Sequence, residues 1–279
     1  MDVTKPGTIK ELLAKYNLSI RKSWGQNFLL NSQVTEKIAQ AANLTKEEMV
    51  LEVGPGLGVL TQELLARAGR VTALEIDPRL CQLLRDRFGH LPDFALINGD
   101  ALEYDYSLLP RGYKAVANLP YYITSPFIFQ LLEGGNPPPL AVLLVQLEVA
   151  KRLAAGPGAP DYGAMSVAVQ YYCQVDIVTR VGGGNFYPPP KVESAVVKLT
   201  WHQQRPYQPE SPQLMFRIIK LAFGQRRKML KNLVAKGVGL PVTTVVQVLE
   251  EMGISPGVRG EELSVSLYSE LSDRLGAHL

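Results

Sequence analysis

The sequence predicts an α/β fold in which a largely parallel sheet has helices on both faces, followed by a smaller all-helical domain. Short apolar runs alternate with helical patterns through the first two thirds of the chain, as strands and crossover helices do. Beyond a proline-bearing polar segment near residue 203, the pattern becomes wholly helical. The chain has 279 residues, which is enough for one large domain and one small domain.

Five apolar runs are expected to form buried parallel strands, because each is short and continuous. They are MVLEV (49–53), VTALEI (71–76), FALIN (94–98), KAVAN (114–118) and LAVLLVQ (140–146). Helical periodicity separates them, as in LTQELLARA (60–68) and PRLCQLLRDRF (78–88). QVDIVTR (174–180) and SAVVKLT (194–200) have little helical pattern between them, and we expect them to close the sheet as an antiparallel edge pair.

The segment WHQQRPYQPESP (201–212) reads as a linker between the two domains. Four helical patterns follow it, and Gly237, Gly239, Pro241, Gly253 and Pro256 separate them. We therefore expect an N-terminal arm over residues 1–30, a sheet domain over 31–203 and a helical domain over 204–279.

The composition excludes several classes of protein. Apolar residues make up 46% of the chain and charged residues 20%, as in ordinary globular proteins. The longest apolar run, 140–145, is far shorter than the ~20 residues that a membrane helix needs. Two distant cysteines in apolar segments favour buried thiols in the cytoplasm, and three isolated histidines offer no metal site. We expect a cytoplasmic monomer without metal or membrane.

Basic residues gather in two places although the net charge is only +3. Residues 211–235 contain no acid, and the N-terminal arm is also rich in lysine and arginine. Such surfaces suit a phosphate-bearing partner, whereas the alternative is a solvated helix face. The cations are Arg217, Lys220, Arg226, Arg227, Lys228 and Lys231 in the first place, and Lys5, Lys10, Lys15, Arg21 and Lys22 in the second.

The nine residues QRRKMLKNL (225–233) are expected to form one helix. Arg226, Arg227, Lys228 and Lys231 would lie along its exposed side, with Met229, Leu230 and Leu233 available to the core. This helix would place its cations against the phosphates of such a partner, where contacts set position and carry little sequence information.

Glycines and acids follow the predicted strands in a pattern typical of a nucleotide pocket. The first strand runs into GPGLG (54–58), where glycines allow a sharp turn and a close approach to a ligand. Glu75 ends the second strand, Asp100 follows the third and Asn118 follows the fourth. Open α/β sheets bind ligands beyond the carboxyl ends of their strands. The alternatives are turn chemistry for the glycines, a helix cap for Glu75 and a turn role for Asp100.

The glycine spacing distinguishes between nucleotide cofactors. The dinucleotide fingerprint places glycine at positions one, three and six. Here Gly54 and Gly56 hold the first two positions, Gly58 holds position five and Val59 position six. This Gly-x-Gly-x-Gly spacing resembles that of the S-adenosylmethionine methyltransferases, in which no pyrophosphate has to be bound.

The tetrapeptide NLPY (118–121) would lie at the mouth of this pocket. If the methyl acceptor is the exocyclic amine of adenine, its lone pair is delocalised into the ring. The Asn118 side-chain oxygen and the Leu119 carbonyl could accept from the amino hydrogens and favour a pyramidal, attacking nitrogen. Pro120 stiffens the turn, and Tyr121 offers a face for a base withdrawn from its stack. Tyr122 is expected to pack in the interior.

Several longer segments resemble the ribosomal RNA adenine dimethyltransferases. They are WGQNFL (24–29), LEVGPGLGVLT (51–61), LEIDPRL (74–80), NGDAL (98–102), NLPYYITSPF (118–127) and NFYPPPKVESAVV (185–197). They occur in order over most of the chain, and the match is closest to the bacterial small-subunit branch. The resemblance implies a Rossmann-like S-adenosylmethionine methyltransferase sheet with a helical C-terminal domain.

The same resemblance assigns roles to individual residues. It implies that Asn27 and Leu29 contact the cofactor from the arm, that Gly54 and Gly56 lie against it, and that Glu75 binds the ribose and Asp100 the adenine amine. Asn118 would border both cofactor and target. Phe186 would close on the target base opposite Tyr121, although the sequence around it alone favours a core aromatic before a proline turn.

The resemblance therefore implies dimethylation of two adjacent adenosines in the 3′-terminal hairpin loop of 16S rRNA, within the small ribosomal subunit or its precursor. One alternative is a large-subunit rRNA adenine methyltransferase that confers antibiotic resistance. The other is a ribosome assembly factor that keeps the fold but not the turnover. The intact NLPY tetrapeptide argues against the second alternative.

Overall fold

The computed structural model describes residues 6–18, 26–225 and 227–279 and divides the chain into two compact units. The first unit comprises residues up to Ala150 together with Val175–Trp201, and the second comprises Lys151–Gln174 with His202–Leu279. The sequence predicts that 151–174 belongs to the sheet domain. The structure places it in the helical unit, because Tyr162, Val167 and Tyr171 belong to that unit's core.

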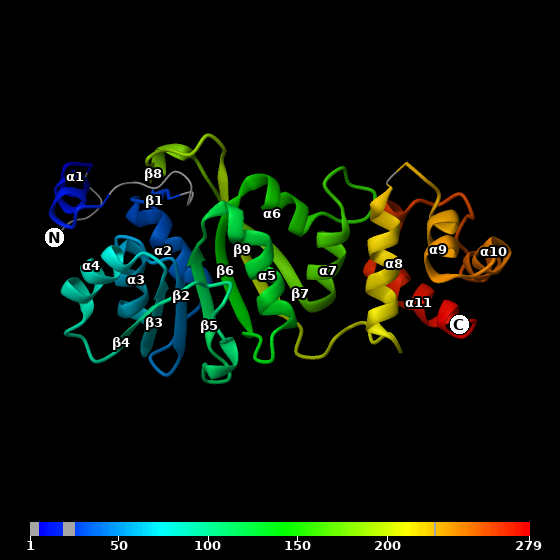
Figure 1. Ribbon diagram of the computed structural model, residues 1–279, viewed down its shortest axis with the longest axis horizontal. Helices are drawn as coiled ribbons and strands as arrows, with labels where there is room; N and C mark the ends of the chain where they lie inside the picture. The colour runs from blue at the N-terminus through cyan, green and yellow to red at the C-terminus, as the bar shows by residue number, and fades with distance from the viewer. Residues whose placement is uncertain (1–5, 19–25, 226) are drawn as a thin grey trace. The chain divides into compact units, whose positions relative to one another are not determined.

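A seven-stranded sheet forms the first unit (Figure 1). Five neighbouring strands, β4, β3, β2, β5 and β6, run parallel to one another. At one edge β9 runs antiparallel to β6, and β7 lies beyond β9. The seven predicted strands are thus confirmed. Their order is β4 (Phe94–Asn98), β3 (Arg70–Glu75), β2 (Met49–Val53), β5 (Lys114–Asn118), β6 (Leu140–Gln146), β9 (Ser194–Trp201), β7 (Cys173–Val181).

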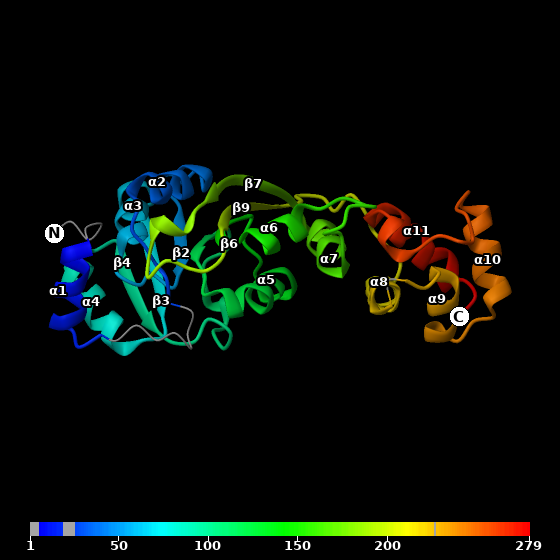
Figure 2. The same cartoon turned by 90° about the horizontal axis from the view of Figure 1, so that it is seen from above.

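Helices cover both faces of this sheet (Figure 2). Residues of α2 and α3 pack on Val50, Val71, Val116 and Val142, which share one face of the strands. In Figure 2, α5 lies on the opposite side. The helices of this unit are α1 (Pro6–Lys15), α2 (Ser32–Ala41), α3 (Val59–Arg67), α4 (Pro78–Phe88), α5 (Thr124–Glu133), and α6 (Leu147–Ala154), which runs into the second unit.

The order of the strands contains a reversal between β2 and β5. The chain moves outward from β2 to β3 and β4, then returns to place β5 on the other side of β2. At such a reversal the connections leave in opposite directions, so a crevice opens beyond the carboxyl ends of the two strands. This topology puts the loops after β2 and β5 at the place where a ligand is expected.

A small sheet that the sequence analysis missed joins distant parts of the first unit. Strand β1 (Phe28–Leu29) pairs antiparallel with β8 (Phe186–Tyr187), and Leu30 N donates to Asn185 O at 2.9 Å. Each strand has two residues, which is too short for a periodic signal. This small sheet holds Phe28 and Leu29 beside the start of the FYPPP segment (186–190).

The second unit is helical, and its core consists of buried aliphatic and tyrosine side chains. Tyr162 donates from its hydroxyl to Leu263 O at 2.8 Å, which ties the region before α7 to the C-terminal helices. Both cysteines are buried free thiols, as predicted. The helices are α7 (Ala164–Tyr172), α8 (Pro212–Gly224), α9 (Leu230–Val238), α10 (Val242–Glu251) and α11 (Val265–Gly276).

Candidate active site at the carboxyl edge of the sheet

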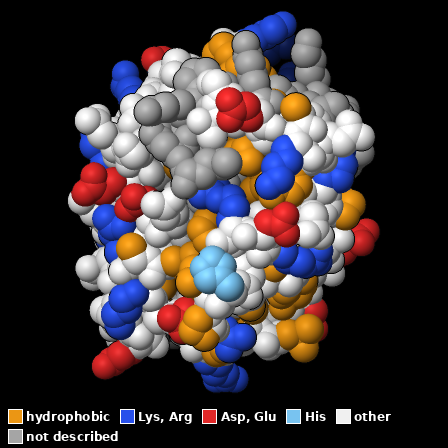
Figure 3. Space-filling model, turned by 90° about the vertical axis from the view of Figure 1, so that its left-hand side faces the viewer, with side chains coloured by type: hydrophobic (Ala, Val, Ile, Leu, Met, Phe, Trp, Pro, Cys, Tyr) orange, Lys and Arg blue, Asp and Glu red, His pale blue; other side chains and the backbone are white. Residues whose placement is uncertain are grey.

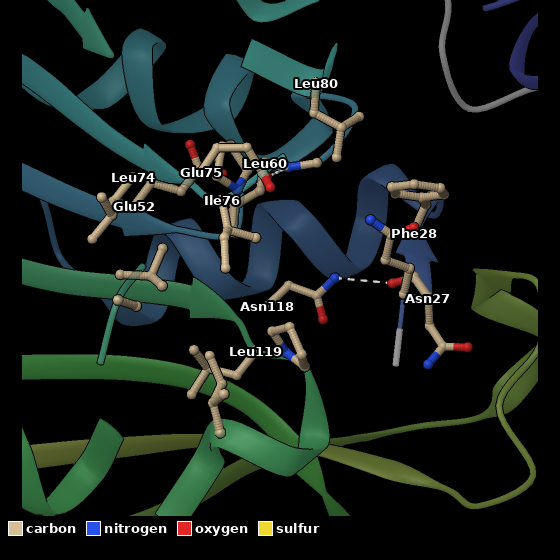
Figure 4. A pocket seen from close by; sticks show the side chains of 18 of the residues that line it. Asn27, Phe28, Glu52, Leu60, Leu74, Glu75, Ile76, Leu80, Asn118 and Leu119 are labelled. Atoms are coloured by element: carbon tan, nitrogen blue, oxygen red, sulfur yellow. Dashed lines mark hydrogen bonds between the residues drawn. The ribbon is translucent and has the colours of Figure 1, made fainter. Parts of the chain in front are cut away.

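A pocket opens at the reversal between β2 and β5 (Figure 4). The space inside it, including the solvent at its open mouth, is about 1030 Å³. Every predicted cofactor residue lines it, and so does the whole NLPY tetrapeptide. These residues are Asn27, Leu29, Gly54, Gly56, Glu75, Asp100, Asn118, Leu119, Pro120 and Tyr121.

The glycines after β2 form one wall of the pocket through their backbone alone. Gly54 and Gly56 have φ values of +69° and +57°, which side chains disfavour. A Cβ at Gly56 would lie 3.1 Å from the Phe28 ring, and one at Gly54 would lie 3.5 Å from the Asn118 carbonyl oxygen. The backbone conformation therefore favours glycine at both positions, and space is tight only at Gly56, because 3.5 Å is an ordinary van der Waals contact. The resulting hollow fits the close approach of a nucleoside ligand.

Glu75 faces the pocket from the end of β3 with its two oxygens anchored. Its Oε2 accepts from Gly56 N at 3.2 Å and its Oε1 accepts from Asp77 N at 3.0 Å. The side chain is 5% exposed. Burial raises the pKa of Glu75 to about 7, although these backbone donors favour the charged form. The cap of α4 is Asp77, which accepts from Arg79 N, so the helix-cap alternative for Glu75 is wrong.

Asp100 combines a turn role with a place in the pocket. One of its oxygens accepts from Leu102 N at 2.8 Å, as the turn alternative required. The residue also lines the pocket beyond β4. A carboxylate has about four lone-pair sites, so this one backbone bond leaves acceptor capacity for a ligand amine.

Asn118 is oriented by the arm that precedes α2. Its Nδ2 donates to Asn27 O at 3.2 Å, and Figure 4 shows this bond crossing from the end of β5 to β1. No hydrogen-bond donor among the described residues contacts Asn118 Oδ1. The amide is therefore held with its oxygen available to a ligand.

Tyr121 is also held by a distant residue. Its hydroxyl hydrogen-bonds to Ser194 Oγ at 2.8 Å, and Ser194 is fully buried at the start of β9. Burial raises the pKa of Tyr121, so the phenol stays protonated near neutrality. Tyr122 is 57% exposed and lines the pocket, so the expected packing role for Tyr122 is wrong.

Phe186 lies elsewhere in the first unit. It is 4% exposed and packs with Leu29 and Val34 in the core cluster under α2, and it is not among the residues that line the pocket. This is the place that its immediate sequence favoured. Phe186 is paired with Leu29 in the small antiparallel sheet, and Leu29 does line the pocket.

The basic segment of the second unit has a different local structure from the one expected. Helix α8 ends at Gly224 and α9 begins at Leu230, so the prediction of one helix over 225–233 is wrong. Gly224 stands at the end of α8, and glycine is about 1 kcal/mol less favourable than alanine inside a helix. Leu230 N donates to Val258 O at 2.9 Å, which fixes the start of α9. Met229 is 45% exposed instead of packed.

Three of the four predicted RNA-binding cations lie in the described chain. Arg227 and Lys228 are exposed in the turn between the helices, and Lys231 is half-buried in the first turn of α9. None of these three has an ion-pair partner among the described residues. Arg226 lies outside the described residues, as do Lys5, Arg21 and Lys22 of the arm.

On the face of the first unit in Figure 3, Lys and Arg side chains are interspersed with acidic and apolar ones, so the described part of that face has no uniform basic field. Residues 6–18, 26–225 and 227–279 contain no group of His, Cys, Asp and Glu that could hold a metal. Within the same ranges, every helix is too short or too polar to cross a membrane.

Comparisons with known proteins agree with this geometry. A family model described as ribosomal RNA adenine dimethylase matches residues 17–275. "Ribosomal RNA small subunit methyltransferase A" from Halothermothrix orenii is 41% identical over 98% of this chain and 94% of its own. The protein of the same name from Pelotomaculum thermopropionicum is 42% identical over 97% of this chain and 96% of its own.

Two solved structures are similar over nearly the whole chain. A dimethyladenosine transferase from Plasmodium falciparum has a TM-score of 0.76 at 27% identity, covering 88% of this chain and 95% of that one. The 23S rRNA methyltransferase ErmE has a TM-score of 0.74 at 28% identity, covering 90% of this chain and 100% of that one. From the family model and these relatives together, the chain belongs to the ribosomal RNA adenine dimethylase family.

Proposed function

We propose that this protein dimethylates the exocyclic amines of two adjacent adenosines in the 3′-terminal hairpin loop of 16S rRNA, within the small subunit or its precursor. The methyl donor is S-adenosylmethionine, and the enzyme acts as a cytoplasmic monomer in ribosome assembly. One observation carries the proposal. The NLPY turn lines the same pocket as the glycine loop and the two acids at the strand ends.

The donor, when bound, supplies an electrophilic methyl group on a sulfonium. The described residues fit such a ligand at three points. Glu75 keeps lone pairs free beyond its two backbone bonds and accepts from ribose hydroxyls. Asp100 accepts from the adenine amine. The glycine hollow and Asn27 and Leu29 border the remaining part of the pocket, where the methionine moiety fits.

Asn118 prepares the target amine. Its oxygen is directed by the Nδ2–Asn27 hydrogen bond, so no reorganisation is needed when the amine arrives. Together with the Leu119 carbonyl, it accepts from the amino hydrogens and favours a pyramidal nitrogen. The catalytic gain therefore comes from orientation and hydrogen bonding, and no strong general base is required.

Tyr121 binds the base that has left its stack. A ring face of this kind contributes ~1–3 kcal/mol per stacked base. The hydroxyl bond to Ser194 fixes the plane of the ring, which makes the stacking surface rigid. Closure of Phe186 on the opposite face remains a prediction from the family resemblance, and it requires Phe186 to leave the core cluster.

Cations of the second unit bind the RNA backbone. Arg227 and Lys228 lie in an exposed turn without ion-pair partners among the described residues, so their charges are available to phosphates. Arg226 and Lys231 complete the proposed set. Because phosphate contacts carry little sequence information, specificity comes from the shape of the folded subunit and from loop adenosines that are easily flipped.

The large-subunit alternative has some support in the likeness to ErmE. The full-length relatives named for the small subunit are more similar, at 41% and 42% identity against 28%. Incubating the protein and labelled S-adenosylmethionine with separated unmethylated small and large subunits distinguishes the two. We expect label in small-subunit RNA only. Label in large-subunit RNA supports the alternative, and binding without label supports a non-catalytic assembly factor.

A further inference from the structure

A third carboxyl group lines the pocket besides those of Glu75 and Asp100, and the proposed roles leave it unused. Glu52 is the fourth of the five residues of strand β2, is 1% exposed and lines the pocket. Neither of its oxygens has a hydrogen-bond partner of ordinary geometry among the described residues. An unpaired buried acid in a core strand is costly, so its presence calls for an explanation.

The register of the sheet groups Glu52 with the other polar residues of the site. Side chains alternate along a strand, so Glu52 shares the face of Val50 and Glu75 shares the face of Val71. Val50 and Val71 are paired neighbours, which puts both acids on one face of the sheet. Asn118 is on that face too, because Glu52 pairs with Val116. Gly54, between Glu75 and Asn118, has no side chain to cover Glu52.

The surroundings of the two acids contain little that would neutralise them. Glu52 faces the Thr61 hydroxyl of α3, which is itself unpartnered, and the Glu75 carboxyl. Glu75 faces Asp77 and the Cys81 thiol of α4, with Tyr122 and Asp100 across the pocket. Two cations act on these groups: Arg79 is paired with Asp77 at 2.8 Å, and Arg85 of α4 lies near enough to the Cys81 thiol to favour its charged form.

We propose that Glu52 and Glu75 form a buried pair of carboxyl groups that selects a positively charged ligand and loses a proton to solvent when that ligand binds. This inference rests on the proposed methyl donor, whose sulfonium gives it one more positive charge than the neutral thioether left after transfer. The acid pair thereby favours the charged donor and disfavours the product, which promotes exchange between successive methylations.

The protonation states support this arrangement. Burial raises the pKa of Glu52 to about 8; the Thr61 hydroxyl opposes this shift and the nearby Glu75 adds to it. Near neutral pH the unliganded pair therefore holds protons that a cation would expel. The sign follows from linkage: donor affinity rises with pH through this range, by up to about tenfold per pH unit for each proton released.

Calorimetry tests the proposal. S-adenosylmethionine and S-adenosylhomocysteine are titrated into the wild-type protein and Glu52→Gln at about pH 7 in buffers of different ionisation enthalpy, which gives the protons released. Both ligands also carry an α-amino group, and its contribution is the part of the proton release that Glu52→Gln retains. We expect more protons released by the donor than by the product in the wild type. We also expect Glu52→Gln to reduce this difference and lower the donor preference roughly 5- to 150-fold.

The controls separate the possible failures. Glu47→Gln, an exposed acid outside the pocket, should behave as wild type. If the wild type binds no donor, the proposed function itself is wrong. If the donor binds but Glu52→Gln releases the same number of protons, the acid pair has no such role. If that variant does not fold, the wild-type ratio of donor to product affinity decides, because a ratio that stays flat between pH 6 and about 9 contradicts the proposal.

Discussion

The carboxyl edge of the sheet and the turn between α8 and α9 differ in structure. We assign methyl transfer to the first and binding of the RNA backbone to the second. At the sheet edge, Asn118 and Tyr121 are each fixed by a hydrogen bond to a distant segment, Asn118 to Asn27 and Tyr121 to Ser194. At the turn, Arg227 and Lys228 are exposed and have no ion-pair partner among the described residues. Chemistry needs fixed geometry, whereas backbone binding needs only available charge.

This contrast predicts large, specific losses at the sheet edge and small, graded losses at the turn. The largest is expected for Asn118→Ala, which removes the acceptor that we propose for the target amine. Turnover should fall by ~10²–10³-fold, as when one preorganised hydrogen-bonding group is lost from an active site. Affinity for unmethylated small subunits should stay near that of the wild type.

Single-turnover methyl transfer and filter binding measure these two quantities. Asn232→Ala, an exposed residue of α9, is the matched control and should change neither. Comparable losses of turnover and subunit affinity in Asn118→Ala would mean that Asn118 maintains the fold, and the contrast between the two regions would disappear.

The next largest effect concerns Glu75. Glu75→Ala should weaken S-adenosylmethionine binding by roughly 10- to 150-fold, because hydrogen bonds to charged groups are worth about 1.5–3 kcal/mol. The variant should still unfold cooperatively. Calorimetry with Glu47→Ala as the control measures the affinity, and an unchanged dissociation constant would remove Glu75 from the cofactor site.

Because the Tyr121 hydroxyl is hydrogen-bonded to Ser194, the roles of its ring and of its hydroxyl can be tested separately. Tyr121→Phe keeps the stacking face and should retain far more activity than Tyr121→Ala. It also leaves the buried Ser194 hydroxyl without its partner, which should cost about 1–3 kcal/mol of stability.

Adding Ser194→Ala to Tyr121→Phe should recover part of that loss, because the unpartnered hydroxyl is removed. Urea denaturation of the single and double variants forms the cycle. Additive losses would show that the two hydroxyls do not interact, and equal activity of Tyr121→Phe and Tyr121→Ala would contradict the stacking role.

The smallest effect per residue is expected at the turn. Neutralising Arg226, Arg227 and Lys228 together should weaken subunit binding and flatten its log–log salt dependence by about 0.7–0.9 for each lost phosphate contact. Cofactor affinity should not change. The control neutralises Lys37, Arg70 and Arg111, which are exposed on the first unit. If the salt dependence of subunit binding changes only in the control variant, the RNA-binding surface lies on the first unit.

The same contrast explains what the sequence could predict. The strands and their polar ends were predictable because buried parallel strands are continuous apolar runs, and their carboxyl ends meet at one edge. The arm pairing between Phe28 and Tyr187 was not, because two residues 159 positions apart leave no local pattern. The turn at 225–229 was misread since apolar and basic residues continue through it at helical spacing.

Glu52 could have been recognised from the sequence as an unusual residue. An acid inside MVLEV, on a strand otherwise buried and apolar, is rare unless it serves a purpose. Its partner could not be inferred, because only the register of β2 and β3 shows that Glu75 lies on the same face. Tyr122 was misplaced for a similar reason, since its exposure depends on the short helix that follows Pro120.

We propose that one pocket at the sheet edge methylates adjacent adenosines of the small subunit. This proposal can be tested by mass spectrometry of adenosines from unmethylated small subunits treated with the protein and S-adenosylmethionine labelled in its methyl group. We expect four labelled methyl groups per subunit, two on each of two neighbouring adenosines in the 3′-terminal loop. Unmodified adenosines in those subunits, or label confined to other positions, would contradict it.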